Sequence, residues 1–397
     1  MAAPFDKYKK DINRSTFVRY NENYLVGTFG SADVTPFWVA DSDFIVMPEL
    51  VKALKKTAKR GLYPYELKTP EIKQPLIDWF KKRHKININL DGLLFTTSVN
   101  SGLAATIDEL TAKGDGIIIQ PPVFQGFKGI IKGVGRKVVN NKLTLKDGKY
   151  EINFSDLEKK AADKKNTAMV LCSPHNPVGR VWTQQELEKI AEICIANNVL
   201  MLSDEIHADI IYSKATFIGM TEVYKGKSDN IIMLGSAGKS FGIPGLVDSF
   251  MYTPNPVLKK KIQERIMRFH LGKSNAFGNA ALKTVYTHGN KWLDKKLNYL
   301  EKTVSAIEAY LAKNIPEITL TIPEGTYQVW LDFNKVTKND EELKELLYKK
   351  AKLGITLGTE YGIGGKGYAR MNIASPRPMI LKALAKLKKA LNNFVII

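Results

Sequence analysis

Short apolar runs alternate with helical stretches between about residues 92 and 252. Seven such runs occur: Leu93 to Thr97, Ile117 to Gln120, Lys137 to Asn140, Ala168 to Cys172, Val199 to Ser203, Ile231 to Leu234 and Asp248 to Tyr252. Runs without polar alternation are typical of strands buried on both faces, and helices between such strands serve as crossovers in a parallel sheet. The pattern therefore predicts an α/β core built on a mostly parallel sheet.

The pattern differs on both sides of this core. Residues 1–45 show no clear periodicity until Thr35–Ala40, which predicts an N-terminal arm leading into a short strand. Beyond residue 285, a lysine-rich helix is predicted over 289–312, and the partial alternation of Thr326–Phe333 predicts a half-exposed strand. We therefore predict three parts: an arm that joins the smaller domain (1–45), a large α/β domain (46–285) and a small α+β domain (286–397).

One helix carries a clear local start signal. Thr183 and Glu186 have the spacing of a capping box, in which each side chain bonds the backbone amide of the other residue. The helix that they open is predicted to end before Asn197.

Composition excludes several classes of protein. The chain has 397 residues, 44% of them hydrophobic, which is enough for two or three domains with their own cores. No apolar run approaches the ~20 residues needed to cross a bilayer, and Met1–Lys7 lacks the pattern of a secretory signal. We expect no membrane span and a cytoplasmic location. Cys172 and Cys194 lie in apolar stretches and are expected in the core, and the histidines show no metal-ligand spacing, so no metal site is expected.

The net charge of +19 raises the question of a nucleic-acid partner. Most of the basic residues are lysines scattered through helix-like segments such as Val51–Lys56 and Leu381–Lys386, not gathered in one arm. This distribution favours a solvated, lysine-rich surface, and no nucleic-acid partner is expected.

Polar residues follow four of the apolar runs. They occur in Thr96–Gly102, Ser173–Arg180, Ser203–His207 and Gly235–Phe241. In open α/β sheets, binding sites gather at the carboxyl ends of the strands. A lysine, a carboxylate, an amide and a hydroxyl-rich turn before a helix match pyridoxal 5'-phosphate (PLP): the amine forms the Schiff base, the carboxylate keeps the pyridine nitrogen protonated and the helix N-terminus takes the phosphate.

Each of these residues alone has an ordinary structural explanation. Lys239 is one of many lysines, Asp204 could cap a helix and Asn176 could belong to a turn. Their joint occurrence in this strand order favours a cofactor site.

The chain resembles the fold-type I PLP enzymes of the class I/II aminotransferase superfamily, and within it the MalY/PatB-like cystathionine β-lyase (C-S lyase) branch. The similarity runs almost end to end through Trp38–Phe44, Pro174–Trp182, Ser203–His207, Trp292–Asp294, Pro323–Tyr327 and Arg370–Ala374. His175, Trp182 and His207 are more typical of the lyase branch than of the superfamily. The resemblance implies the PLP-dependent transferase fold, with a large domain on a mostly parallel sheet and a smaller α+β domain.

The resemblance also implies roles around the cofactor ring. Lys239 is the Schiff-base lysine and the catalytic residue, Asp204 pairs with the pyridine nitrogen, and Asn176 donates to the ring hydroxyl. Phe124 stacks on the ring, and His207 also belongs to the cofactor site. Arg370 binds the α-carboxylate of the substrate, a task that suits a bidentate guanidinium.

At the phosphate end, the resemblance assigns Ser236, Val99 and Asn100 to the phosphate, and places Tyr65 there from a neighbouring subunit, which implies a homodimer. The chain departs from the family at Gly238, Gly242 and Val247, where a hydroxyl residue, an asparagine and a phosphate-binding arginine are usual. Asn100 adds a side-chain amide to the phosphate turn.

The function implied is that of a C-S β-lyase, which cleaves L-cystathionine or related L-cysteine S-conjugates by α,β-elimination to a thiol, pyruvate and ammonia. An aminotransferase of L-amino acids would use the same residues and is the alternative. A basic nucleic-acid-binding or regulatory protein on the same fold is a third, less favoured interpretation. The glycine-rich stretch Gly362–Gly367 precedes a strand and does not fit a nucleotide loop, so we predict a mobile loop near the substrate entrance.

Overall fold

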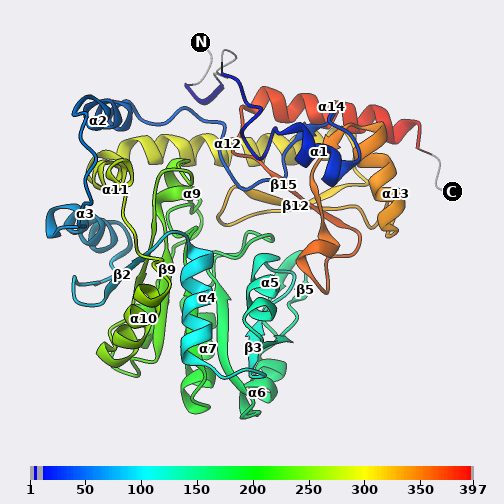
Figure 1. Cartoon of the computed structure of the whole chain (residues 1–397). Helices are drawn as coiled ribbons and strands as arrows, with labels where there is room; N and C mark the ends of the chain where they lie inside the picture. Colours follow the sequence, from blue (N-terminus) through cyan, green and yellow to red (C-terminus); the bar gives the residue numbers. More distant parts are fainter. Residues whose placement is uncertain (1–3, 7–11, 395–397) are drawn as a thin grey trace.

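The computed structural model describes residues 4–6 and 12–394. The prediction that the chain lacks a secretory signal rested on Met1–Lys7, and most of these residues lie outside the described ranges. The chain forms a large sheet and a small sheet, which lie one above the other with helices around both (Figure 1). No described helix is long and apolar enough to cross a membrane. A search of the same residues finds no group of three or more His, Cys, Asp or Glu side chains placed to hold a metal ion.

The large sheet has seven strands in the order β2-β10-β9-β8-β7-β3-β4. They are β2 (Leu93–Thr96), β3 (Gly116–Ile119), β4 (Lys137–Asn140), β7 (Asn166–Cys172), β8 (Leu200–Asp204), β9 (Ile231–Gly235) and β10 (Ser249–Tyr252). β10 is antiparallel to both of its neighbours, β2 and β9, and all other neighbouring strands of this sheet are parallel. Each strand arises from one of the seven apolar runs, so the predicted mostly parallel sheet is confirmed.

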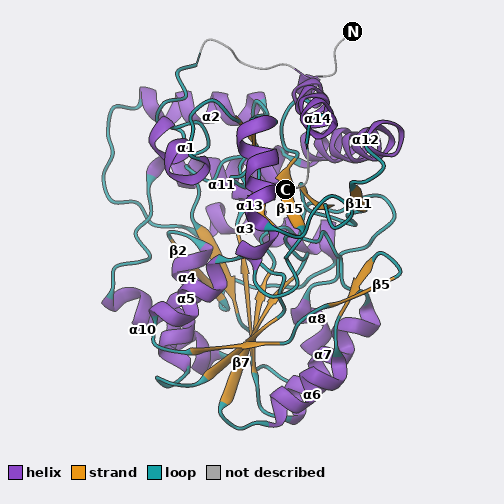
Figure 2. Cartoon of the chain, turned by 90° about the vertical axis from the view of Figure 1, so that its right-hand side faces the viewer, coloured by secondary structure: helices purple, strands orange, loops and turns teal. Residues whose placement is uncertain are grey.

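Helices cover both faces of the large sheet (Figure 2). One face packs against α4 (Val99–Leu110), α5 (Gly126–Gly133) and α10 (Pro256–Arg268), and the other against α6 (Phe154–Ala162), α7 (Gln184–Ala196) and α8 (Met220–Tyr224). Because successive side chains of a strand point to opposite faces, Ile117 of β3 joins the first core and Ile118 joins the second. This burial on both faces explains the apolar character of the inner strands, whereas the edge strand β4 has exposed polar residues at both ends. Thr183 and Glu186 form the predicted capping box of α7.

The small sheet is antiparallel, in the order β11-β12-β15-β14. It contains β11 (Thr319–Thr321), β12 (Gln328–Asp332), β14 (Thr356–Leu357) and β15 (Tyr368–Asn372), and it packs against α12 (Asn290–Asn314) and α14 (Arg377–Asn392). A strand does form within Thr326–Phe333, but the prediction that it is half-exposed is wrong, because Gln328–Leu331 are buried. Strand β12 is interior to the sheet, with Val329 in the core beneath it and Trp330 stacked on Tyr368 (5.3 Å between ring centroids).

The N-terminal arm packs on the side of the small sheet. It contains α1 (Glu22–Phe29) and β1 (Thr35–Pro36), and β1 pairs with β13 (Leu353–Gly354). Arg19 is fully buried and forms ion pairs with Asp41 and Asp43, each at 3.2 Å. The arm shares its core with residues 299–390, and the predicted boundaries at 45 and 285 stay predictions.

The remaining elements connect these layers. They are η1 (Pro4–Asp6), α2 (Pro48–Lys59), α3 (Pro70–Trp79), η2 (Phe80–His84), β5 (Thr144–Lys146), β6 (Lys149–Glu151), α9 (Ala237–Phe241), α11 (Ala276–His288), α13 (Asp340–Lys344), η3 (Glu345–Lys350) and η4 (Gly358–Tyr361). Gly362–Gly367 precedes β15 and approaches Pro121 and Pro122. Its mobility stays a prediction. Both cysteines are buried and free, as predicted for core residues.

Candidate active site

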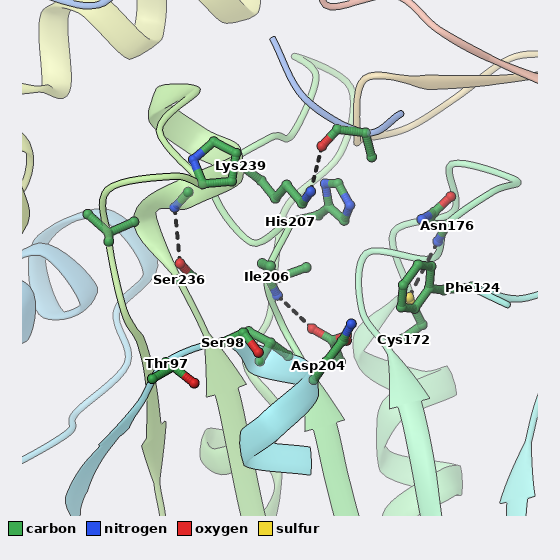
Figure 3. Close-up of a pocket in the computed structure, with 16 residues that line it drawn as sticks. Thr97, Ser98, Phe124, Cys172, Asn176, Asp204, Ile206, His207, Ser236 and Lys239 are labelled. Carbon is green, nitrogen blue, oxygen red and sulfur yellow. Dashed lines mark hydrogen bonds between the residues drawn. The ribbon is translucent and has the colours of Figure 1, made fainter. Parts of the chain in front are cut away.

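A cavity of about 200 Å³ lies at the carboxyl ends of β7, β8 and β9 (Figure 3). It is lined by Val99, Asn100, Phe124, Asn176, Asp204, His207, Ser236 and Lys239, all of them predicted site residues. These residues are far apart in the sequence but follow neighbouring strands, so the parallel sheet brings them to one edge. Arg370 lies next to this group without lining the cavity, and Tyr65 lies elsewhere.

Lys239 extends from α9, the short helix that follows β9. The Ser236 hydroxyl caps this helix by accepting a hydrogen bond from the Gly238 amide (3.1 Å). The Lys239 Nζ donates to the carbonyl of Ala40 in the N-terminal arm. Burial lowers the pKa of Lys239 to about 8, and the Arg370 charge acts in the same direction. Roughly one tenth of the amine is therefore neutral at pH 7, far more than for an ordinary lysine, and the neutral form is the one that acts as a nucleophile or base.

Asp204 ends β8, the strand next to β9, and is the acid that lines the cavity. One carboxylate oxygen accepts a hydrogen bond from the backbone amide of Ile206 (3.1 Å). Burial raises the pKa of Asp204 to about 6, although this hydrogen bond and the Lys239 charge oppose the rise. The carboxylate is therefore mostly ionised at neutral pH, and it presents a negative charge to a ligand in the cavity.

Arg370 connects the small sheet to the site. It lies on β15, is buried, and its Nη1 donates to the side-chain oxygen of Asn176 (3.4 Å). Its Nη2 donates to the carbonyl of Trp38, while its buried Nε has no partner among the described residues. The guanidinium thus retains hydrogen-bonding capacity beside the cavity, which suits recognition of a carboxylate.

Phe124 and Ile206 add apolar surface to the cavity (Figure 3). Phe124 follows β3 and packs edge-on against Phe127 (5.4 Å between centroids). Sequence reasoning assigned no role to Ile206, although it lies inside the motif Ser203–His207. Ile206 lies in the turn directly after β8, and its place between Asp204 and His207 in that motif was the available signal. An aromatic and an aliphatic side chain are suited to hold a flat ring.

His207 is a neutral histidine beside Lys239 (Figure 3). Burial lowers its pKa to about 3, and the charges of Lys239, Arg370 and Lys296 add to this effect. Its Nδ1 is buried without a partner among the described residues, and the ring packs edge-on against Tyr327 (5.5 Å between centroids). At neutral pH the imidazole can therefore donate or accept one hydrogen bond without carrying charge.

The N-terminus of α4 closes another side of the cavity. Ser98 caps the helix and forms a reciprocal capping box with Ser101. The amides of Val99 and Asn100 belong to the first turn, where backbone N–H groups have no intrahelical partner. Lys239 is the only cationic side chain among the described lining residues. Val247 also lines the cavity, at the position where the family resemblance leads us to expect a phosphate-binding arginine. An anion here would be held by helix amides and hydroxyls.

Tyr65 does not join this chain's cavity. Its side chain is 90% exposed, and Lys273 lies over its ring at 5.3 Å. Leu62, Tyr63 and Leu67 in the same segment are also exposed, which leaves an apolar surface. The predicted role of Tyr65 in a second subunit stays a prediction.

The fold and the site define a class of protein: an α/β protein that holds an activated lysine and a buried carboxylate in one cavity beneath an arginine from a second sheet. The sequence pattern of the family described as aminotransferase class I and II matches residues 33–387. The chain belongs to this family, and the resemblance stated from the sequence is confirmed.

The chain is similar over most of its length to several relatives and solved structures. The cystathionine beta-lyase PatB of Bacillus subtilis (strain 168) is 33% identical over 367 residues, which cover 92% of this chain and 94% of PatB. The crystal structure of cystalysin from Treponema denticola, which contains a pyridoxal 5'-phosphate cofactor, superposes with a TM-score of 0.93 at 31% identity and covers all of both chains. An aspartate aminotransferase of Pyrococcus horikoshii is 26% identical over 373 residues, 91% of each chain.

Proposed function

We propose that this protein is a PLP-dependent C-S β-lyase that acts on L-cystathionine or related L-cysteine S-conjugates. The observation that carries the proposal is the pairing of Lys239, whose pKa is lowered to about 8, with the buried Asp204 in one cavity. The similarity to PatB and cystalysin over nearly the whole chain supports the lyase branch.

The donor set fits PLP. The cavity holds an amine for the aldehyde, a carboxylate for the pyridine nitrogen and the Asn176 amide for the ring hydroxyl, with His207 beside them. Phe124 and Ile206 offer apolar surface to the ring, while Ser236, Val99 and Asn100 surround the end where a phosphate fits. When bound, PLP accepts the electron pair that is left when the substrate Cα loses its proton.

The protein's own groups then have separate tasks. With PLP bound, Arg370 would bind the substrate carboxylate, and the neutral amine of Lys239 would take the Cα proton. The C–S bond breaks, the sulfur leaves as a thiolate, and the protonated Lys239 is the nearby acid that can return the proton to it. His207 stays neutral and is suited to position groups, not to deliver a proton. Water then releases the remaining carbon skeleton as pyruvate and ammonia.

An aminotransferase of L-amino acids is the second candidate. It would use Lys239, Asp204 and Arg370 in the same positions, but without loss of the Cβ substituent. The similarity to an aspartate aminotransferase favours this candidate. Only elimination forms pyruvate and a thiol without a keto-acid acceptor, and this difference separates the two.

The protein is further proposed to work as a homodimer in the cytoplasm. Tyr65 is 90% exposed in an apolar segment, which is the surface that a second copy would cover. In the dimer, the Tyr65 hydroxyl would reach the phosphate in the other copy's cavity.

The deciding experiment supplies cofactor-loaded protein with L-cystathionine and no keto acid, and measures thiol and pyruvate together. Equimolar release of both, lost in Lys239→Ala and retained in the exposed control Lys214→Ala, supports the lyase. If neither product forms until an acceptor is added with an amino-acid donor, the protein is an aminotransferase. Near-normal turnover by Lys239→Ala would show that this lysine does not have the proposed catalytic role.

A further inference from the structure

His175 and Trp182 are two buried motif residues to which the proposed reaction gives no task. They lie on either side of Asn176 in the segment between β7 and α7, and their exposed fractions are 0% and 1%. A polar side chain buried this completely is expected to have a hydrogen-bond partner. The partner of His175 lies on a different segment of the site.

The side chain of His175 bonds to the segment that carries Phe124. Its Nε2 lies 2.9 Å from the carbonyl oxygen of Pro122. A carbonyl only accepts hydrogen bonds, so Nε2 carries the proton and donates it. Burial lowers the pKa of His175 to about 4, so the ring is neutral at pH 7 and has this single N–H group. The Nδ1 atom is buried and has no partner among the described residues.

Trp182 fixes the orientation of the histidine ring. The two rings pack edge-on with 5.3 Å between their centroids, and the Trp182 Nε1 donates to the Cys172 carbonyl at the end of β7 (3.0 Å). The backbone of His175 is held as well, because its amide donates to the Arg180 carbonyl and its carbonyl accepts from the Gly179 amide, both at 2.8 Å. The imidazole is therefore a fixed point to which the Pro122 carbonyl is bound.

Phe124 lies two residues beyond Pro122, in the connection between β3 and α5. On the side of α5, its ring packs edge-on against Phe127 (5.4 Å between centroids), and a Cβ at Gly126 would collide with it. On its other side, Phe124 lines the cavity together with Asn176 (Figure 3). The hydrogen bond to the Pro122 carbonyl joins the segment of Phe124 to the turn of Asn176, and thereby relates the positions of these two side chains.

We propose that His175 is a positioning residue for the cofactor ring: its Nε2–H bond to Pro122 holds Phe124 against the face of a PLP ring whose hydroxyl is bound by Asn176. The inference rests on the proposed function, because it requires the cavity to hold PLP. His175 itself lies behind the residues that line the cavity and does not touch the ring.

The test measures the equilibrium binding of PLP to cofactor-free protein by visible absorbance. His175→Leu removes the N–H group at a similar side-chain volume, and we expect its dissociation constant for PLP to be about tenfold higher, which corresponds to the loss of one aromatic ring contact. His175→Gln should bind PLP nearly as well as the wild type, because its amide nitrogen reaches the position of Nε2. His288→Leu, at an exposed histidine, is the matched control and should bind PLP like the wild type.

His175→Asn covers the case in which the leucine variant does not fold. It also carries an amide, but its side chain is one carbon shorter than glutamine and does not reach the Pro122 carbonyl, so it too should bind PLP more weakly. An unchanged dissociation constant in folded His175→Leu or His175→Asn protein overturns the inference, as does an equal loss of affinity in His175→Gln.

A double-mutant cycle with Phe124→Leu tests whether His175 acts through Phe124. If it does, His175→Leu should change the affinity of the Phe124→Leu protein for PLP by less than about twofold. A residue that only stabilises the fold would lower the affinity equally in both backgrounds. Additive losses would therefore overturn the positioning role.

Failure of the proposed function has a different signature. A wild-type protein that does not bind PLP, or whose visible band persists unchanged in Lys239→Ala, overturns both proposals. Protein that binds PLP through Lys239 with an affinity that does not respond to His175 overturns only the role of His175. Protein that shows the His175 effect but releases no thiol from L-cystathionine overturns only the lyase.

Discussion

The lowered pKa of Lys239 predicts how cofactor capture depends on pH. Only a neutral amine attacks the PLP aldehyde, and burial lowers the pKa of Lys239 from 10.5 to about 8. At pH 7, roughly one tenth of the lysine is then neutral, compared with roughly one part in 3,000 for an ordinary lysine. The second-order rate constant of capture should rise about tenfold per pH unit from pH 6 and level off above pH 8.

The assay mixes cofactor-free protein with PLP and follows the absorbance change over time at each pH. Nα-acetyl-lysine measured in parallel corrects for the ionisation of PLP itself, and its rate should keep rising to about pH 10. If the protein's corrected rate also rises tenfold per unit up to pH 10, Lys239 has an ordinary pKa. The reasoning from burial would then be refuted.

Three substitutions extend the predictions. Asp204→Ala should lower thiol release at least about 10²-fold, because it removes the charge that stabilises the electron-accepting ring; activity within twofold of the wild type would contradict the assignment. Arg370→Lys should raise KM for amino-acid substrates about tenfold while the cofactor absorbance is retained, since lysine cannot bind a carboxylate in bidentate fashion; steady-state kinetics would show this, and an unchanged KM would argue against it. Thr183→Ala should lower the free energy of unfolding by about 1 kcal/mol through loss of the α7 cap; the urea midpoint measures this, and Gln184→Ala, one residue further on, serves as the control.

Much of the fold could be predicted because it depends on local patterns. The seven runs became the seven strands of the large sheet, and Thr183 and Glu186 formed the expected capping box. The half-exposed strand over Thr326–Phe333 was mispredicted, because alternation in the sequence does not show that a second layer covers the other face.

The sequence by itself determined which chemistry the site holds, because Asp204, Ser236 and Lys239 lie at or shortly after the ends of strands and the carboxyl ends of parallel strands meet at one edge. Only the tertiary structure decided what surrounds these groups. Three hydrogen bonds join residues that are far apart in the chain. They run from Lys239 to the Ala40 carbonyl, from Arg370 to the Asn176 side chain, and from Lys296 to the Lys239 carbonyl. Periodicity describes each element alone, whereas such contacts depend on how the elements pack, and packing sets the pKa values by which this site works.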